Sequence, residues 1–178
     1  TRAFIAEFAA RGGDEYEATV RSFAASDNPD IAWRARRALA ARGLVDAGAI
    51  EAWRSADGSG EAARMSVEAL ASLPIEEARR HAWESVYSET LSNDFLTATL
   101  AGLQASSWEG EPGIEAAVDR LRSYWESHTI GMALRYANGV LAYGLDIDRD
   151  GSVSRSVGLL RSWLDTNSDA PSQLRRIV

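Results

Sequence analysis

Cysteine and lysine are both absent from this chain of 178 residues, and histidine occurs only twice. Without cysteine, the chain cannot form a disulfide, a thiolate zinc site or a cysteine nucleophile. Without lysine, it cannot contain the G-x-x-x-x-G-K-S/T loop that binds nucleotide phosphates. Because a cysteine-free composition suits a reducing compartment, we expect a cytoplasmic location.

Long apolar segments are also missing, so we expect no membrane-spanning helix. The 26 acidic residues outnumber the 19 basic ones, which gives a net charge of −7. A protein of this sign repels nucleic-acid phosphates and anionic lipids. We therefore expect neither nucleic acid nor a membrane among its partners.

The two histidines form no recognisable catalytic or metal motif. His81 lies in RRHAWES and His128 in ESHTIG, and neither has a second histidine four residues away, as a helical zinc site requires. The serines lack a G-x-S-x-G nucleophile motif. We interpret both histidines as hydrogen-bonded or solvated side chains. The sequence assigns no catalytic, metal-binding or cofactor-binding residue in this chain, and it leaves the substrate-binding residues unknown.

Apolar residues recur at helical spacing along nearly the whole chain, and alternating strand patterns are rare. This periodicity predicts about ten or eleven short helices. Their expected ranges are 2–11, 14–25, 31–43, 46–56, 60–73, 74–87, 91–104, 113–127, 129–143, 152–166 and a last helix from 171. Candidate N-caps are Asp27 or Asn28 for the third segment, Asp46 for the fourth, and Ser92 or Asn93 for the seventh.

The connections between these helices are only a few residues long, which favours antiparallel neighbours. A chain of helical hairpins that each expose an apolar stripe is typical of an α-solenoid of the HEAT or armadillo type. We therefore predict an all-α fold, an α-α superhelix that forms a single helical-repeat domain over residues 1–178. No repeat is visible in the residues themselves, so a compact helical bundle is the alternative.

Six tryptophans and three arginine clusters are candidate recognition residues. The tryptophans are Trp33, Trp53, Trp83, Trp108, Trp125 and Trp163. Five of them lie within predicted helices, so we interpret them as packing residues rather than stacking platforms. The clusters are Arg34 with Arg36 and Arg37, Arg79 with Arg80, and Arg175 with Arg176. We interpret most of these arginines as solvated, with one or two lining a concave surface that receives a carboxylate.

The segment LDIDRDGSVSRSV resembles a calcium-binding loop, because Asp146, Asp148, Asp150 and Gly151 occupy its first, third, fifth and sixth positions. Its twelfth position is Val157, which cannot supply the carboxylate oxygens that complete such a shell. Aspartate and glycine are also the ordinary residues of a turn before a helix. We interpret the segment as a connection between helices and leave weak calcium binding open.

Three segments together resemble the C-terminal helical domain of actinobacterial aminopeptidase N, a zinc aminopeptidase of the gluzincin class. They are DNPDIAWRARRALAARGLVDAGAIEAW, LSNDFLTATLAGLQ and YWESHTIGMALRYANGVLAYGLDIDRDGSVSRSVGLLRSWLDTN, in the order and spacing of that family. The likeness covers most of the chain from about residue 27 onward. The family's catalytic H-E-x-x-H motif and its G-x-M-x-N amine-binding loop do not occur in this sequence, so no catalytic residue is carried over.

The resemblance implies a non-catalytic domain that encloses the active site of a zinc aminopeptidase and holds or selects its peptide substrate. It implies that the chain is not an enzyme by itself. The partners would be the catalytic domain of the same polypeptide, which would hold the zinc, and the peptide. The alternative is a freestanding helical-repeat adaptor. Apolar residues in RAFIAEF and QLRRIV, where such an adaptor carries polar capping helices, favour a domain excised from a larger chain.

Overall fold

The computed structural model describes residues 1–88, 90–106, 114–144 and 155–178. Within these ranges the chain forms twelve α-helices and no strand, which confirms the all-α prediction. The helices are α1 (Arg2–Arg11), α2 (Asp14–Ala24), α3 (Pro29–Ala41), α4 (Ala47–Asp57), α5 (Gly60–Ala71), α6 (Glu76–Val86), α7 (Asn93–Ala105), α8 (Ile114–Asp119), α9 (Leu121–Ser127), α10 (Ile130–Gly144), α11 (Arg155–Thr166) and α12 (Ser172–Ile177). None of the described helices is both long and apolar enough to cross a bilayer.

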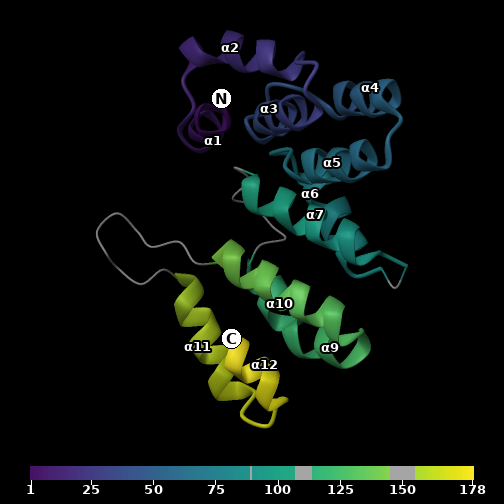
Figure 1. Cartoon of the computed structure of the whole chain (residues 1–178). Coiled ribbons are helices and arrows are strands. Elements are labelled where there is room, and N and C mark those ends of the chain that lie inside the picture. The colour runs from purple at the N-terminus through teal and green to yellow at the C-terminus, as the bar shows by residue number, and fades with distance from the viewer. Residues whose placement is uncertain (89, 107–113, 145–154) are drawn as a thin grey trace.

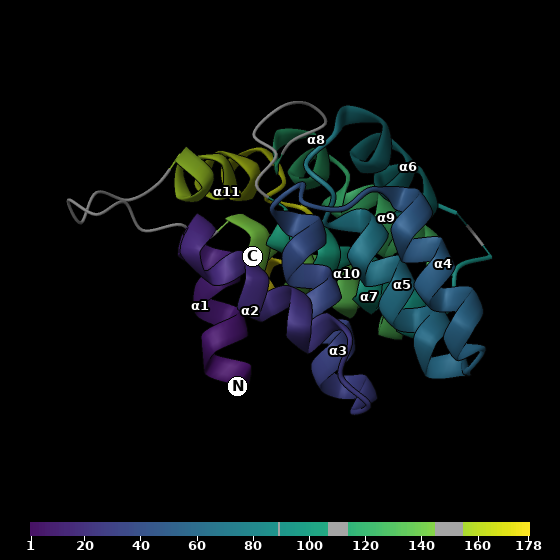
Figure 2. The same cartoon turned by 90° about the horizontal axis from the view of Figure 1, so that it is seen from above.

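Five helices form a row that follows the order of the chain (Figure 1). In this row α1, α3, α5, α7 and α10 each contact the next member. The intervening helices pack against the row: α2 on α1 and α3, α4 on α5, and α6 on both α5 and α7. Seen from above, α6, α8 and α11 lie along one edge of the molecule, opposite α1 and α3 (Figure 2). Helices that are close in sequence are therefore also close in space.

The core follows the row as three adjoining apolar clusters. The first cluster joins α1, α2 and α3 through residues such as Ile5, Val20 and Leu39. The second lies between α3, α4 and α5 around Trp33 and Ile50. The third and largest cluster holds the remaining helices together. Because each cluster uses neighbouring helices, burial is distributed along the chain instead of being concentrated at one centre.

The predicted helix caps are present at three helix starts. Asn28 accepts two backbone N–H groups, at 3.1 and 3.3 Å, from the first turn of α3, where Pro29 is the first residue. Asp46 accepts one at 2.8 Å at the start of α4. Ser92 accepts one at 3.3 Å at the start of α7. These side chains satisfy amide donors that have no partner within the helix, and so they set where each helix begins.

The segment 113–127, predicted as one helix, is divided into α8 and α9 at Arg120. In an unbroken helix the Ala117 carbonyl would accept the Leu121 amide. It accepts instead the hydroxyl of Tyr136, at 2.8 Å, from α10. A side chain inserted into the backbone ladder is a known cause of a sharp helix break. The prediction of a single helix was wrong because this hydroxyl comes from a helix farther along the chain.

Two glycines allow the helices of the row to approach closely. A Cβ atom on Gly102 of α7 would lie 2.3 Å from the Glu68 carbonyl oxygen and 2.6 Å from the Ala71 Cβ, both on α5. A Cβ atom on Gly139 of α10 would lie 2.6 Å from a methyl of Leu100 on α7. Gly102 requires hydrogen in place of a side chain, because backbone atoms of a packed helix cannot withdraw. Opposite Gly139 the contact is with the Leu100 side chain, which would have to shift to admit a methyl group.

We expect Gly102→Ala to lower the free energy of unfolding by about 1–3 kcal/mol, since the added methyl overlaps the α5 backbone. Gly158→Ala in α11 is the matched control, because a Cβ atom there meets nothing within 4 Å. The control should stabilise the protein by about 0.5–1 kcal/mol through helix propensity. Urea unfolding followed by tryptophan fluorescence measures both changes, and equal effects of the two variants would contradict the close approach.

Removing the Tyr136 hydroxyl should destabilise the fold, because its hydrogen bond to the Ala117 carbonyl is lost. Tyr136→Phe leaves the buried Ala117 carbonyl without its donor, and we expect a loss of about 1–3 kcal/mol. Tyr16→Phe removes an identical hydroxyl from a side chain that is 46% exposed, and its effect should be close to zero. If Tyr136→Phe is as stable as the Tyr16 variant, then its hydrogen bond does not maintain the break between α8 and α9.

Candidate functional site

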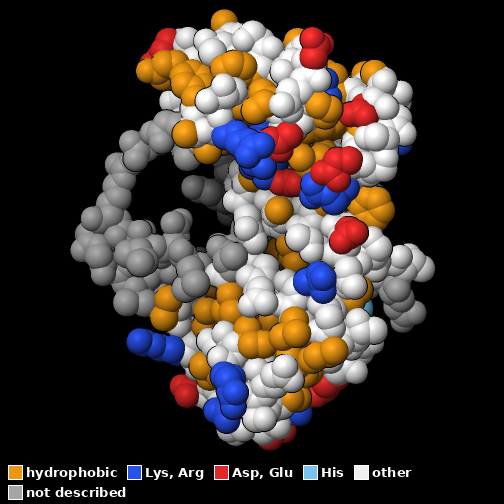
Figure 3. Space-filling model, in the orientation of Figure 1, with side chains coloured by type: hydrophobic (Ala, Val, Ile, Leu, Met, Phe, Trp, Pro, Cys, Tyr) orange, Lys and Arg blue, Asp and Glu red, His pale blue; other side chains and the backbone are white. Residues whose placement is uncertain are grey.

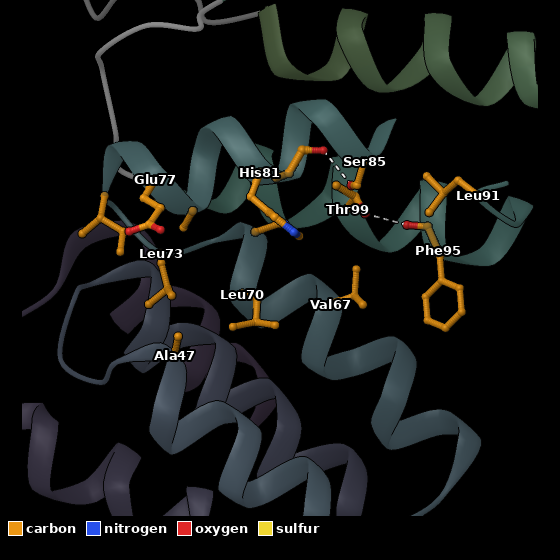
Figure 4. Close-up of a pocket in the computed structure, with 14 residues that line it drawn as sticks. Ala47, Val67, Leu70, Leu73, Glu77, His81, Ser85, Leu91, Phe95 and Thr99 are labelled. Carbon is orange, nitrogen blue, oxygen red and sulfur yellow. Dashed lines mark hydrogen bonds between the residues drawn. The ribbon is translucent and has the colours of Figure 1, made fainter. Parts of the chain in front are cut away.

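A groove of about 600 Å³ runs along α6, between this helix and the pair α5 and α7 (Figure 4). Its walls are mostly hydrocarbon. Val67 and Leu70 from α5 and Phe95 from α7 line it, and each of these side chains is only half-buried. Leu73, just after α5, and Leu91, just before α7, add to the apolar lining. Cavities of this size and composition are typical of small-molecule sites.

The groove exists because α6 presents small side chains to its neighbours. Ala78, Ala82 and Ser85 recur at helical spacing on the face that lines the cavity. Larger residues at these positions would fill the space against Val67 and Leu70. Apolar side chains that stay partly hydrated forgo about 25 cal/mol of stabilisation for each Å² left exposed. The groove is therefore unfilled volume that the protein retains at a cost in stability.

The polar groups of the groove are separated between its wall and its mouth. The Ser85 hydroxyl donates to the Ala82 carbonyl at 2.8 Å, and the Thr99 hydroxyl donates to the Phe95 carbonyl at 2.8 Å. Both protons are thus used within their own helices. Glu77 and His81, one turn apart on α6, are exposed lining residues. The wall consequently offers no free hydroxyl proton, and the ionisable groups lie where the groove meets solvent.

Glu77, His81 and Ser85 recur every four residues along α6, in the order of an acid, a base and a nucleophile (Figure 4). A hydrolytic triad requires hydrogen bonds that join such residues in series. Within the part of the chain that the structure describes, no hydrogen bond links the three side chains, and Ser85 donates to a backbone carbonyl. Their arrangement fits binding better than acyl transfer. Sequence reasoning missed this row because each residue is ordinary on a helix surface.

A second site, which is polar, lies between α3 and α5, where basic and acidic side chains gather on one face (Figure 3). Glu68 is only 8% exposed and is paired with Arg37 of α3 and, at 3.8 Å, with Arg64 of its own helix. Arg64 also donates to Glu61 at 2.5 Å, and the carboxylate of Glu61 raises the pKa of Arg64. These guanidinium groups already have carboxylate partners, which favours a structural role for them.

The arginine clusters are less solvated than the sequence interpretation expected, and Arg79 differs most. Arg79 was expected on a solvated face, yet it is completely buried, whereas its neighbour Arg80 is exposed and pairs with Glu84 at 3.2 Å. The reason is the register of α6, which places Arg79 on the same face as the buried Trp83 and Val86. Helical spacing puts such residues together whatever their polarity. The prediction of a carboxylate-receiving arginine surface stays a prediction.

His128 belongs to an aromatic cluster with Tyr124 and Tyr136 and does not line the α6 groove. Its ring stacks on Tyr124 with centroids 3.8 Å apart, and Tyr124 stacks in turn on Tyr136 at 4.1 Å. The Nδ1 atom lies 2.9 Å from the Ser127 hydroxyl, while the buried Nε2 atom has no hydrogen-bond partner among the described residues. Burial raises the pKa of Tyr124 to about 12, so its hydroxyl keeps its proton at physiological pH.

The tryptophans described by the structure contribute to packing, as predicted. Trp33, Trp83 and Trp163 are buried in the core, and Trp53 and Trp125 are half-buried beside it. Trp108 lies outside the described residues. None of the five forms an exposed stacking platform, which agrees with their interpretation as residues that join neighbouring helices.

The candidate calcium loop cannot be placed, because Asp146, Asp148, Asp150 and Gly151 lie outside the described residues. Val157, its twelfth position, is a half-buried residue of α11. Among the residues that are described, no three His, Asp or Glu side chains are grouped so as to hold a metal ion.

No family model matches the chain, and no curated protein matches it in sequence. The resemblance to the aminopeptidase domain therefore remains a prediction.

We expect Glu68→Gln to lower the free energy of unfolding by about 1.5–3 kcal/mol, because it weakens charged hydrogen bonds at a buried position. Glu61→Gln is the matched control, since it removes a carboxylate from the same Arg64 at the solvent-exposed end of the network. Its effect should be much smaller and should vanish in 1 M salt, where exposed charges are screened. Urea titrations at low and high salt compare the two, and a Glu68 effect that disappears with salt would contradict burial of the pair.

Proposed function

We propose that this chain is a non-catalytic helical domain of a zinc aminopeptidase, and that it encloses the active site and holds the peptide substrate. The observation that carries the proposal is the ordered likeness of three long segments to that family, which covers most of the chain from about residue 27. The row formed by α1, α3, α5, α7 and α10 supports it, because successive helical hairpins are what a HEAT-like superhelix requires.

In this proposal the chemical step belongs to a separate domain. Zinc bound there would activate the water that attacks the peptide bond, with a glutamate of that domain as general base. The described residues of this chain provide no metal-binding group, and their role is to exclude solvent and to limit which peptides reach the reacting atoms. The enzyme would be cytoplasmic, in keeping with a cysteine-free chain.

A freestanding helical-repeat adaptor is the second candidate, and the apolar groove along α6 favours it. The groove has a volume of about 600 Å³ and is lined by half-buried apolar residues such as Leu70 and Phe95. An adaptor needs such a surface to retain a partner, whereas an enclosing domain needs only its row of helices. The two candidates predict native polypeptides of different size in the source cells.

Isolation of the native polypeptide with an antibody against residues 1–178 distinguishes the candidates. We expect a polypeptide much larger than 19.3 kDa that hydrolyses aminoacyl anilides, loses this activity with a zinc chelator and regains it with zinc. A native protein of 19.3 kDa without this activity would refute the aminopeptidase proposal and leave the adaptor.

The enclosing role can be tested separately in the native enzyme. Deletion of the region that corresponds to residues 1–178 should preserve hydrolysis of a small anilide, which needs only the catalytic domain. The same deletion should reduce the selectivity between short and long peptides, because the barrier to long chains is removed. Unchanged selectivity in a deletion variant that still hydrolyses the anilide would contradict the enclosing role.

A further inference from the structure

The groove along α6 has a volume and an apolar lining that favour a ligand with a hydrocarbon portion. Its volume of about 600 Å³ lies within the range of small-ligand sites. The side chains that form its walls are chiefly aliphatic or aromatic, and they come from three helices whose positions are set by the core. The small residues Ala78 and Ala82 leave room for a ligand instead of a neighbouring side chain.

The charged side chain at the solvent-exposed mouth of the groove favours one charge for the polar end of such a ligand. Glu77 is the acidic lining residue, and His81 lies one turn farther along α6. The lining contains no arginine, and the Ser85 and Thr99 protons are donated to backbone carbonyls. An anionic head would thus meet a carboxylate and find no hydroxyl donor. An ammonium group can donate to the Glu77 carboxylate, and the net charge of −7 attracts cations from a distance.

We propose that the α6 groove is a binding site for an amphiphilic cation, a primary amine with an aliphatic or aromatic body. The apolar body would lie against Leu70 and Phe95, and the ammonium group would pair with Glu77 at the mouth. This assignment does not depend on the aminopeptidase proposal, because the side chains that it uses belong to α5, α6 and α7 of this chain. It also differs from peptide enclosure by the row of helices, since a single small molecule fills the groove.

Proton NMR of the purified chain tests the site directly, because the two histidines give separate ring signals and only His81 lines the groove. We expect octylammonium to shift the His81 Cε1 proton in a saturable manner and to leave His128 unchanged. Hexylammonium should bind more weakly, since each buried methylene contributes about fourfold in affinity. Octanoate, with the same body and the opposite charge, should bind at least tenfold more weakly than octylammonium.

Three variants locate the interaction. Glu77→Gln should weaken octylammonium binding at least threefold, while Glu76→Gln, which removes the same charge from a residue outside the lining, should not. Ala78→Leu should fill the groove and abolish binding, with circular dichroism confirming that the helices are retained. Octanol, which has no charge, should bind equally to the Glu77→Gln variant and the unaltered protein.

Each contrary result overturns a part of the proposal. Octanoate binding as tight as that of octylammonium would show that the site does not select a cation. A shift of both histidine signals, or no saturable shift, would show that the groove is not the site. Retention of binding by a folded Ala78→Leu variant would place the amine elsewhere on the protein.

Discussion

The close approach of α5 and α7 is the constraint on which the rest of this fold depends. It is possible because Gly102 has no side chain where α7 meets the Glu68 carbonyl and the Ala71 methyl of α5. Gly139 of α10 lies against the Leu100 side chain of α7. The helices on either side inherit their positions from these contacts: α3 packs on α5, α6 on both α5 and α7, and α9 on α10. A change in the α5–α7 spacing would therefore also disturb the packing of α6, which contacts both helices.

Buried polar groups give this packing a single register. The Tyr136 hydroxyl has its acceptor in the Ala117 carbonyl, and Glu68 has its partners in Arg37 and Arg64. A shift of one helix relative to the next would leave such groups buried and unpaired, at a cost of about 1–3 kcal/mol for each. Apolar contacts tolerate small displacements far better, because they have no preferred direction. The polar contacts thus select one arrangement from the many that hydrophobic burial alone would allow.

The same helices provide two different surfaces for recognition. The face of α3 and α5 is charged, with its arginines already paired to carboxylates, whereas the groove along α6 is apolar and has its ionisable groups at the mouth (Figures 3 and 4). Because the two surfaces differ in chemistry, they fit different ligands. The proposed holding of a peptide uses the row of helices, and the proposed binding of an amine uses the unfilled space beside α6.

The sequence by itself determined the helices. Apolar spacing predicted nearly every one, and Asn28, Asp46 and Ser92 marked three of the starts, because helix formation and capping depend on residues within a few positions of one another. It also excluded disulfides and nucleotide-phosphate loops through residues that are absent. These features are local, so they can be obtained without knowledge of the neighbouring helices.

Only the tertiary structure decided which helix faces meet. The break at Arg120 depends on a hydroxyl from α10, the burial of Arg79 depends on the face that α6 turns to the core, and the groove depends on Ala78 and Ala82 lying opposite Leu70. None of these follows from spacing along one helix alone, since each also depends on how that helix packs against its neighbours. The sequence alone identifies the parts that can pack, and the distances between packed helices decide where a cavity remains.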